Sequence, residues 1–309
     1  MVGPFAMNQS FAGSVDSSHL IYLEVFAVSR FGSFPDVCIF HSVTALENSM
    51  TAIAIVGSQR GFIIAADGRK RLFDEDRASA DTAELEKETD QTRKIFDVAG
   101  DNWKFAYAIR GFCEDTLGFD LIETIKRETR VISSLEFYDS FKLMESLGAG
   151  ISRAMNAARQ AGTIENFPEQ CKVENGGPWF IAEVFFAGYF NGYSRLIIVT
   201  FVHYNQVSGF RLISNPPLPI LVGSDKVRAA MYNLDGSLVP MSPFGKLAKS
   251  LPQRPTLREG EEYAKGYIEA CSSPLARQID PKNCEGIGGH IHIAEITPRG
   301  FNWRVPPLP

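Results

Sequence analysis

Four residues between positions 51 and 111 have the chemistry needed to hydrolyse an amide bond. They are Thr51, Asp67, Lys94 and Gly111. A threonine hydroxyl is a weak nucleophile until a base takes its proton. If Thr51 is the first residue of the mature chain, its own α-amine can be that base, because such amines have a reference pKa of about 7.7–8. Thr51 could therefore act as an N-terminal nucleophile.

The other three residues would support that nucleophile. A Lys94 ammonium beside the hydroxyl favours loss of its proton and keeps the neighbouring amine neutral. Asp67 would hold the lysine charged and oriented. The Gly111 N–H could stabilise the developing oxyanion, and a glycine lets the substrate approach closely. We therefore expect all four residues to be catalytic.

The spacing of these residues relative to predicted strands carries a family resemblance. Asp67 comes sixteen residues after Thr51 and directly follows the apolar run 62–66. Four segments in this order resemble the catalytic half of proteasome β-type subunits and of the bacterial proteasome-like peptidase of the heat-shock system, which are N-terminal nucleophile hydrolases. The segments are Thr51-Ala-Ile-Ala-Ile-Val, Gly61-Phe-Ile-Ile-Ala-Ala-Asp67-Gly-Arg69, Thr92-Arg-Lys94-Ile and Ala108-Ile-Arg-Gly111.

The resemblance implies further residues and properties. It implies supporting roles for Arg69 and Ser224, and a place for Ile109 in the substrate pocket, which indicates cleavage after apolar residues. Asp280 lies four residues before the position of the family's supporting acid and could substitute for it if the loop bulges. Ser224 is equally well explained as the N-cap of a helix that begins at Asp225. The resemblance also implies a peptide substrate, a homo-oligomeric ring with an interior site, and no cofactor or metal. The sequence does not identify an ATPase partner.

Two departures from the family pattern keep other functions open. The family has Thr or Ser where this chain has Ala52, and an Asp and a Ser where it has Cys284 and Ile287. These departures favour a catalytically inactive proteasome-like ring or scaffold subunit. A non-peptidase amidase acting on small amides is a second alternative, because the acidic segment 72–91 and the tail 306–309 could block ring packing or substrate access.

The order of predicted elements indicates an α+β fold. Strands are predicted before residue 111 and again over 179–190, 194–204, 209–214, 218–222, 290–296 and 301–304. Helices are predicted over 112–129, 135–161, 225–234 and 258–272. The acidic segment 72–91 is interpreted as a solvated loop or helical excursion. We expect a four-layer αββα sandwich of the N-terminal nucleophile hydrolase type, with two antiparallel sheets between helix layers.

The first fifty residues differ in composition from the rest. They contain one basic residue, Arg30, and no lysine, and they lack the basic start of a secretory signal. We interpret residues 1–50 as a propeptide or an over-extended start, with Met50 as a start whose removal exposes Thr51. The predicted domain then covers 51–305, and 306–309 is a proline-rich tail.

Composition excludes several other classes of protein. The 309-residue chain is 45% hydrophobic and carries a net charge of −5, which argues against disorder and against nucleic acid as a partner. No apolar run reaches eighteen residues, so no membrane role is predicted. The five cysteines have no CxxC spacing, and we interpret them as free thiols. Free thiols are typical of a reducing compartment, so a cytoplasmic location is predicted. His290 and His292 are interpreted as two polar strand positions rather than a metal site.

Overall fold

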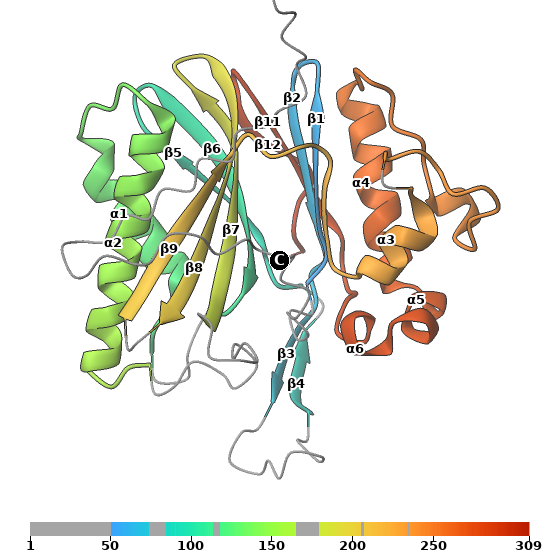
Figure 1. The fold of residues 1–309 in the computed structure, drawn as a ribbon, viewed down its shortest axis with the longest axis horizontal. Helices are drawn as coiled ribbons and strands as arrows, with labels where there is room; N and C mark the ends of the chain where they lie inside the picture. The colour runs from blue at the N-terminus through green and yellow to red at the C-terminus, as the bar shows by residue number, and fades with distance from the viewer. Residues whose placement is uncertain are drawn as a thin grey trace, which may run out of the picture.

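Two five-stranded antiparallel sheets form the centre of the fold in the computed structural model (Figure 1). The structure describes residues 51–73, 85–89, 91–113, 118–164, 179–204, 207–233 and 235–308. The first sheet has the order β10 (Ile220–Val222), β1 (Ile53–Ser58), β2 (Gly61–Ala66), β11 (His292–Thr297) and β12 (Gly300–Val305). The second sheet has the order β5 (Ile95–Ala99), β6 (Trp103–Gly111), β7 (Trp179–Phe190), β8 (Tyr193–Tyr204) and β9 (Val207–Ser214).

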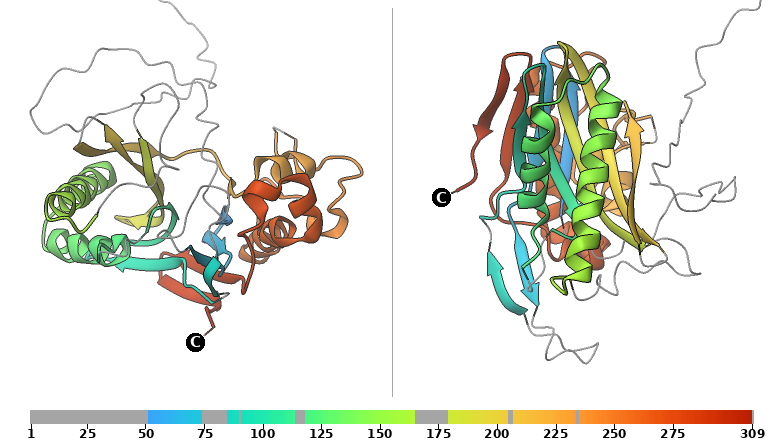
Figure 2. Two further views of the ribbon diagram at one scale, coloured as in Figure 1. Left: turned by 90° about the horizontal axis from the view of Figure 1, so that it is seen from below. Right: turned by 90° about the vertical axis from the view of Figure 1, so that its left-hand side faces the viewer.

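The described residues also form six α-helices. They are α1 (Leu121–Ser133), α2 (Ser140–Gln160), α3 (Asp225–Met231), α4 (Leu257–Ser272), α5 (Pro274–Ile279) and α6 (Pro281–Cys284). The helices α1 and α2 pack on the second sheet, and α4 packs on β1 and β2 of the first, so that the two groups lie on opposite sides of the strands (Figure 2). None of the helices in the described ranges is long and apolar enough to cross a membrane.

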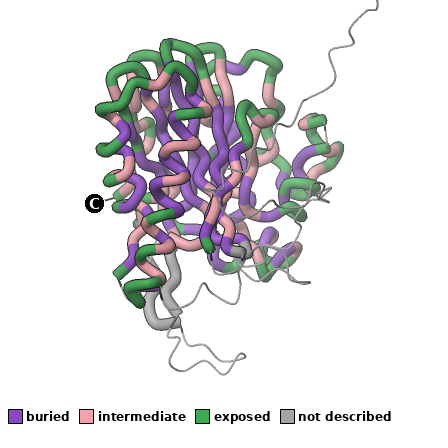
Figure 3. Tube along the Cα trace, turned by 60° about the vertical axis from the view of Figure 1, so that its left-hand side comes forward, coloured by how far each residue is buried: buried purple, intermediate pink, exposed green. Residues whose placement is uncertain are grey.

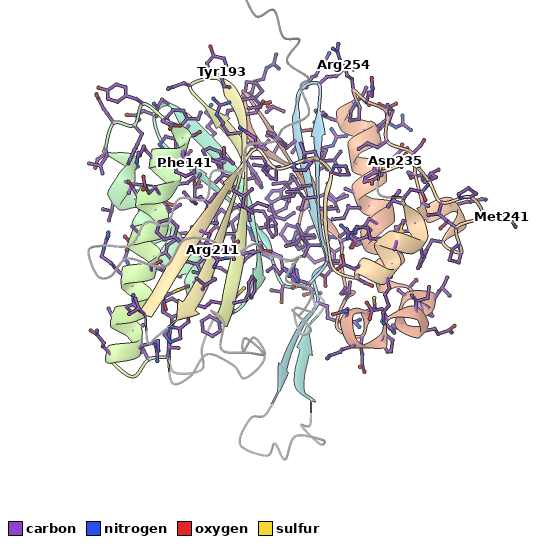
Figure 4. The ribbon with its side chains drawn as sticks, viewed as in Figure 1. Phe141, Tyr193, Arg211, Asp235, Met241 and Arg254 are labelled. Atoms are coloured by element: carbon purple, nitrogen blue, oxygen red, sulfur yellow. The ribbon has the colours of Figure 1, made fainter. Side chains whose placement is uncertain are left out.

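The strand β1 has an unbroken apolar sequence because both of its faces are covered. Ile53 and Ile55 lie in the core between the two sheets, whereas Ala54 and Val56 lie in the core against α4. Side chains alternate between the faces of a strand, so a strand buried on both faces reads as continuous hydrophobic residues. Burial is concentrated in these strands (Figure 3), and side chains fill the space between the sheets (Figure 4).

The strands and helices predicted from sequence periodicity are confirmed in type and order. The first two helices begin later than predicted, because Asp120 and Asp139 cap them: their carboxylates accept hydrogen bonds from the backbone of Glu123 and Phe141. The predicted strands 179–190 and 194–204 form β7 and β8, which pair as an antiparallel hairpin on either side of Asn191 and Gly192.

The predicted four-layer αββα sandwich is wrong in that form. What the described residues show is an α+β fold with two closely packed large sheets and a third sheet of two strands, β3 (Lys70–Phe73) and β4 (Leu85–Thr89). These strands extend beyond the end of the large sheets (Figure 1). The segment 72–91, which was expected to be a loop or a helix, therefore supplies strand residues at both of its ends, while residues 74–84 lie outside the described ranges. The helical cover is also uneven, since α3, α5 and α6 are short.

A buried histidine in the second sheet predicts a loss of stability in acid. Burial, together with the nearby Arg159 guanidinium, lowers the pKa of His203 to about 4 from an ordinary value of 6.5. A lowered pKa means that the unfolded chain binds the proton more tightly, so this contribution is complete above pH 6.5 and is lost as the pH falls toward 4. We expect urea unfolding at a series of pH values to show this slope. A His203→Gln variant should have a shallower slope, and an unchanged slope would contradict the prediction.

Candidate active site

The Asp67 carboxylate is the fixed centre of the candidate site. It lies directly after β2, and its side chain is fully buried. One oxygen accepts hydrogen bonds from the backbone N–H of Ala52 at 2.8 Å and from Lys94 Nζ at 2.9 Å. The other accepts from the backbone N–H of Gly288 at 3.2 Å and of Arg69 at 3.3 Å. Four donors from four parts of the chain therefore hold one carboxylate.

The electrostatics of Asp67 depend on its lysine partner. Burial raises the pKa of Asp67, while the Lys94 charge and the hydrogen bonds from Lys94, Ala52 and Gly288 act in the opposite direction. A buried charge is costly unless it is paired and hydrogen-bonded. The ion pair with Lys94 thus makes a buried carboxylate tolerable at this position.

Lys94 connects Asp67 to Thr51. Its Nζ lies 2.9 Å from Asp67 Oδ1 and 3.3 Å from Thr51 Oγ1, and only 11% of its side chain is exposed. Thr51 lies two residues before β1 of the first sheet, whereas Lys94 directly precedes β5 of the second. The packing of the two sheets therefore brings together three residues that lie 43 positions apart at most. An ammonium beside a hydroxyl favours the deprotonated form of that hydroxyl.

Ser224 and Asp280 form a buried pair beside the start of β1. Ile53 of β1 pairs with Val222 of β10, so Thr51 and Ser224 follow at the same end of the two strands. The backbone between them is also close, since a Cβ on Gly223 would lie 3.4 Å from the Ala52 side chain. Ser224 Oγ donates to Asp280 Oδ2 at 2.6 Å and accepts from the backbone N–H of Val227. The predicted N-cap of α3 is thus confirmed, and the same hydroxyl also contacts the acid that the sequence singled out.

The Asp280 carboxylate is held in its charged form by its neighbours. Burial disfavours the charge, but hydrogen bonds from Ser224 and Asn283 and the charge of Lys226 lower the pKa of Asp280 overall. Asn283 Nδ2 lies 2.9 Å and Lys226 Nζ 3.6 Å from the carboxylate. Sequence reasoning did not predict either partner of Asp280. Asn283 follows Asp280 by three residues and Lys226 follows Ser224 by two, and this closeness in sequence was the only indication of the contacts.

Gly111 occupies a position that only glycine can fill. It ends β6 with a φ of +96°, and a Cβ there would lie 2.6 Å from the carbonyl oxygen of Ile181 and 2.8 Å from the Phe180 ring. Both the positive φ and the contacts exclude a side chain. The oxyanion role remains a prediction.

The other two predicted residues lie in different surroundings. The Arg69 side chain lies against Gly288, with its Cζ 2.9 Å from the position a Cβ would take. Ile109 is 4% exposed and packs in the core that the second sheet forms with α1 and α2. Its place in a substrate pocket remains a prediction.

His292 also contacts the site, and sequence reasoning did not find this contact. Its Nε2 lies 3.0 Å from the backbone nitrogen of Lys94, and 1% of the residue is exposed. The other histidine of the pair, His290, lies 2.8 Å from the carbonyl oxygen of Pro306 through its own Nε2. Each ring therefore has a separate partner. Within the described ranges, no group of three or more His, Cys, Asp or Glu side chains could hold a metal ion.

Comparison with known proteins gave structural similarity only. No family model matches the chain, and no curated protein matches it. One similar structure is Anbu (ancestral beta-subunit) from Yersinia bercovieri, with 12% identity over 82% of this chain and 87% of that chain and a TM-score of 0.45. Another is an Anbu (Gly-1) mutant from Hyphomicrobium sp. strain MC1, with 14% identity over 80% and 81% and a TM-score of 0.42.

These comparisons correct the expected family. The motifs indicated proteasome β-type subunits and the bacterial proteasome-like peptidase, but the similar structures belong to Anbu, a distinct though related family. The expected membership is therefore wrong. Structural similarity this weak does not indicate a function, so the function is inferred from the geometry of the site.

Proposed function

We propose that this chain is an amide-bond hydrolase in which Thr51, as the first residue of the mature chain, is the nucleophile. The observation that carries the proposal is the position of Lys94 Nζ, 3.3 Å from Thr51 Oγ1 and 2.9 Å from the buried Asp67 carboxylate. A lysine held in this way activates the hydroxyl without being the base itself. Peptides and small amides are the substrate classes that fit this chemistry.

The reaction proceeds through an ester intermediate. The Thr51 α-amine takes the proton of Oγ, which attacks the carbonyl carbon, and the oxyanion accepts the Gly111 N–H. When the C–N bond breaks, the amine returns the proton to the leaving nitrogen, and the acyl group remains on Oγ as an ester. Water, deprotonated by the same amine, then hydrolyses the ester and restores the hydroxyl. Lys94 stabilises the alkoxide-like oxygen in both steps, and Asp67 keeps Lys94 in place.

The mechanism requires a free amine at Thr51. We propose that residues 1–50 are absent from the active chain, because Met50 stands directly before the small Thr51 and can serve as a removable start. The active domain then covers 51–305, followed by the tail 306–309. The Ser224 and Asp280 pair supports the proposal, because it places a hydroxyl and a carboxylate beside the start of β1.

A comparison of two N-termini tests the proposed function. One chain starts at Met50, so that methionine removal exposes Thr51, and the other starts at Ser49 behind an initiator methionine, so that residues remain before Thr51. Intact mass verifies both ends, and a panel of fluorogenic peptides and small amides reports hydrolysis. We expect activity only from the first chain, with a loss of about 10⁴-fold in the second because its base is missing.

Two outcomes would contradict the proposal. Equal activity from both chains, with the residues before Thr51 retained, would show that the amine is not the base. No activity from either chain would favour an inactive scaffold subunit, which Ala52 also favours. The homo-oligomeric ring remains a prediction. Light scattering on the first chain would distinguish a ring from a smaller assembly.

A further inference from the structure

His292 is a buried imidazole that reaches from one large sheet to the other at the candidate site. It begins β11, where it pairs with Ala66, the residue before Asp67. Its neighbours two and four positions later, Ala294 and Ile296, lie in the core between the sheets. Because side chains alternate along a strand, the His292 ring points toward the second sheet.

The ring meets the backbone of Lys94. Its Nε2 lies 3.0 Å from the Lys94 backbone nitrogen, and that backbone N–H donates to it. A second contact holds the same stretch of chain, since the N–H of Thr92 donates to the carbonyl oxygen of Gly68 at 2.8 Å. The entry into β5 is thus tied to β11 on one side of residue 93 and to the segment that follows β2 on the other. These ties fix the point from which the Lys94 side chain extends to Thr51.

The contact defines the protonation state of the ring. Because the Lys94 N–H donates to Nε2, this nitrogen carries no proton, and a neutral ring must carry its proton on Nδ1. Burial lowers the pKa of His292 to about 3, and the charges of Lys94, His290 and Arg93 act in the same direction. The edge of the Trp303 ring from β12 packs beside it. The ring therefore accepts from Lys94 throughout the neutral pH range.

We propose that His292 is a positioning residue: through the backbone of Lys94, its Nε2 sets where the Lys94 ammonium meets Thr51. This inference rests on the proposed function. Its physical basis is that a displacement of about 1 Å in a catalytic constellation can cost about 10²-fold in rate. Without the acceptor, the Lys94 N–H is left unpaired in a partly buried place, and the start of β5 is free to shift.

Three variants separate positioning from packing. His292→Phe keeps an aromatic ring but removes the acceptor, His292→Gln offers a carbonyl oxygen at a similar reach, and His290→Phe controls for loss of a histidine nearby. With the amide that the parent hydrolyses fastest, we expect His292→Phe to lower kcat about 10- to 100-fold with KM changed less than about twofold. His292→Gln should recover most of kcat, and His290→Phe should match the parent.

The pH profile gives a readout that packing alone would not move. A nearby cation lowers the pKa of the Thr51 amine, so displacement of Lys94 raises it. Since the amine acts in its unprotonated form, the acid limb of kcat/KM should move to higher pH in His292→Phe and return in His292→Gln. Nitrogen NMR of the parent should show an unprotonated Nε2 on His292, and it needs no substrate.

The outcomes distinguish this inference from the proposed function. A parent that hydrolyses nothing overturns both. An active parent whose His292→Phe variant keeps the same kcat and acid limb overturns only the positioning role, as does a protonated Nε2 in the NMR spectrum. If His292→Phe does not fold, the His292→Gln profile and the NMR measurement decide, because a displaced acid limb or a protonated Nε2 then contradicts the role.

Discussion

Replacement of Thr51 by alanine is expected to abolish hydrolysis, with a fall in kcat of about 10⁴-fold or more. The variant loses the hydroxyl that lies 3.3 Å from Lys94 Nζ, and the next residue, Ala52, offers no substitute. The four donors to the Asp67 carboxylate come from other residues and remain in place. The expected loss is therefore one of chemistry and not of folding, and the melting temperature should change little.

Two controls make the Thr51 result specific. Thr51→Ser keeps the hydroxyl and should retain substantial activity, because the nucleophile and its amine are both present. Thr92→Ala removes a nearby threonine hydroxyl of no proposed catalytic role and should behave like the parent. Activity of Thr51→Ala equal to that of the parent, on a chain whose mass shows residue 51 first, would refute the proposed mechanism.

Replacement of Lys94 by methionine is expected to lower both activity and stability. The methionine fills a similar volume but leaves the Asp67 carboxylate buried without its charged partner. Removal of one member of a buried ion pair costs about 3–5 kcal/mol of folding free energy. Loss of the cation beside Thr51 Oγ1 should also reduce kcat by about 10²- to 10³-fold. Urea unfolding and the fluorogenic assay measure the two effects.

The stability loss in Lys94→Met should depend on pH. Without the lysine, burial raises the pKa of Asp67 further above its ordinary value of 3.8. The folded protein then holds a proton that the unfolded chain releases, so stability is highest in acid and falls as the pH rises from about 3.8 to the raised pKa. A loss of stability that is the same at every pH would contradict this account.

A double variant separates the two effects. Lys94→Met with Asp67→Asn carries no buried charge, so it should recover part of the stability and lose the added pH dependence. It should remain as inactive as Lys94→Met, because no cation is restored beside Thr51. Lys104→Met, on the neighbouring strand β6, tests the loss of a lysine away from the site. Recovery of activity in the double variant would show that Lys94 matters only for folding.

The sequence by itself determined most of the strands and helices. Apolar runs covered on both faces, such as those of β1 and β2, identified strands directly because burial on two sides leaves no polar position. Asp67 and Lys94 were singled out by their spacing from Thr51 in segments that resemble a known family, and the structure brings them within hydrogen-bond distance. The acidic segment after Arg69 misled the prediction, because a hairpin that extends from the fold can be as polar as a loop.

Only the tertiary structure decided which residues meet. In the sequence, His292 looked like one half of a polar pair. Its contact with the Lys94 backbone joins two residues that are 198 positions apart, and it depends on the packing of the two sheets. In the same way, Asp280 stood four residues from the expected place, and the short helix α6 after it leaves its carboxylate against Ser224. Local sequence specifies a strand through its periodic burial, but contacts between sheets depend on the relative placement of whole elements, which no local pattern encodes.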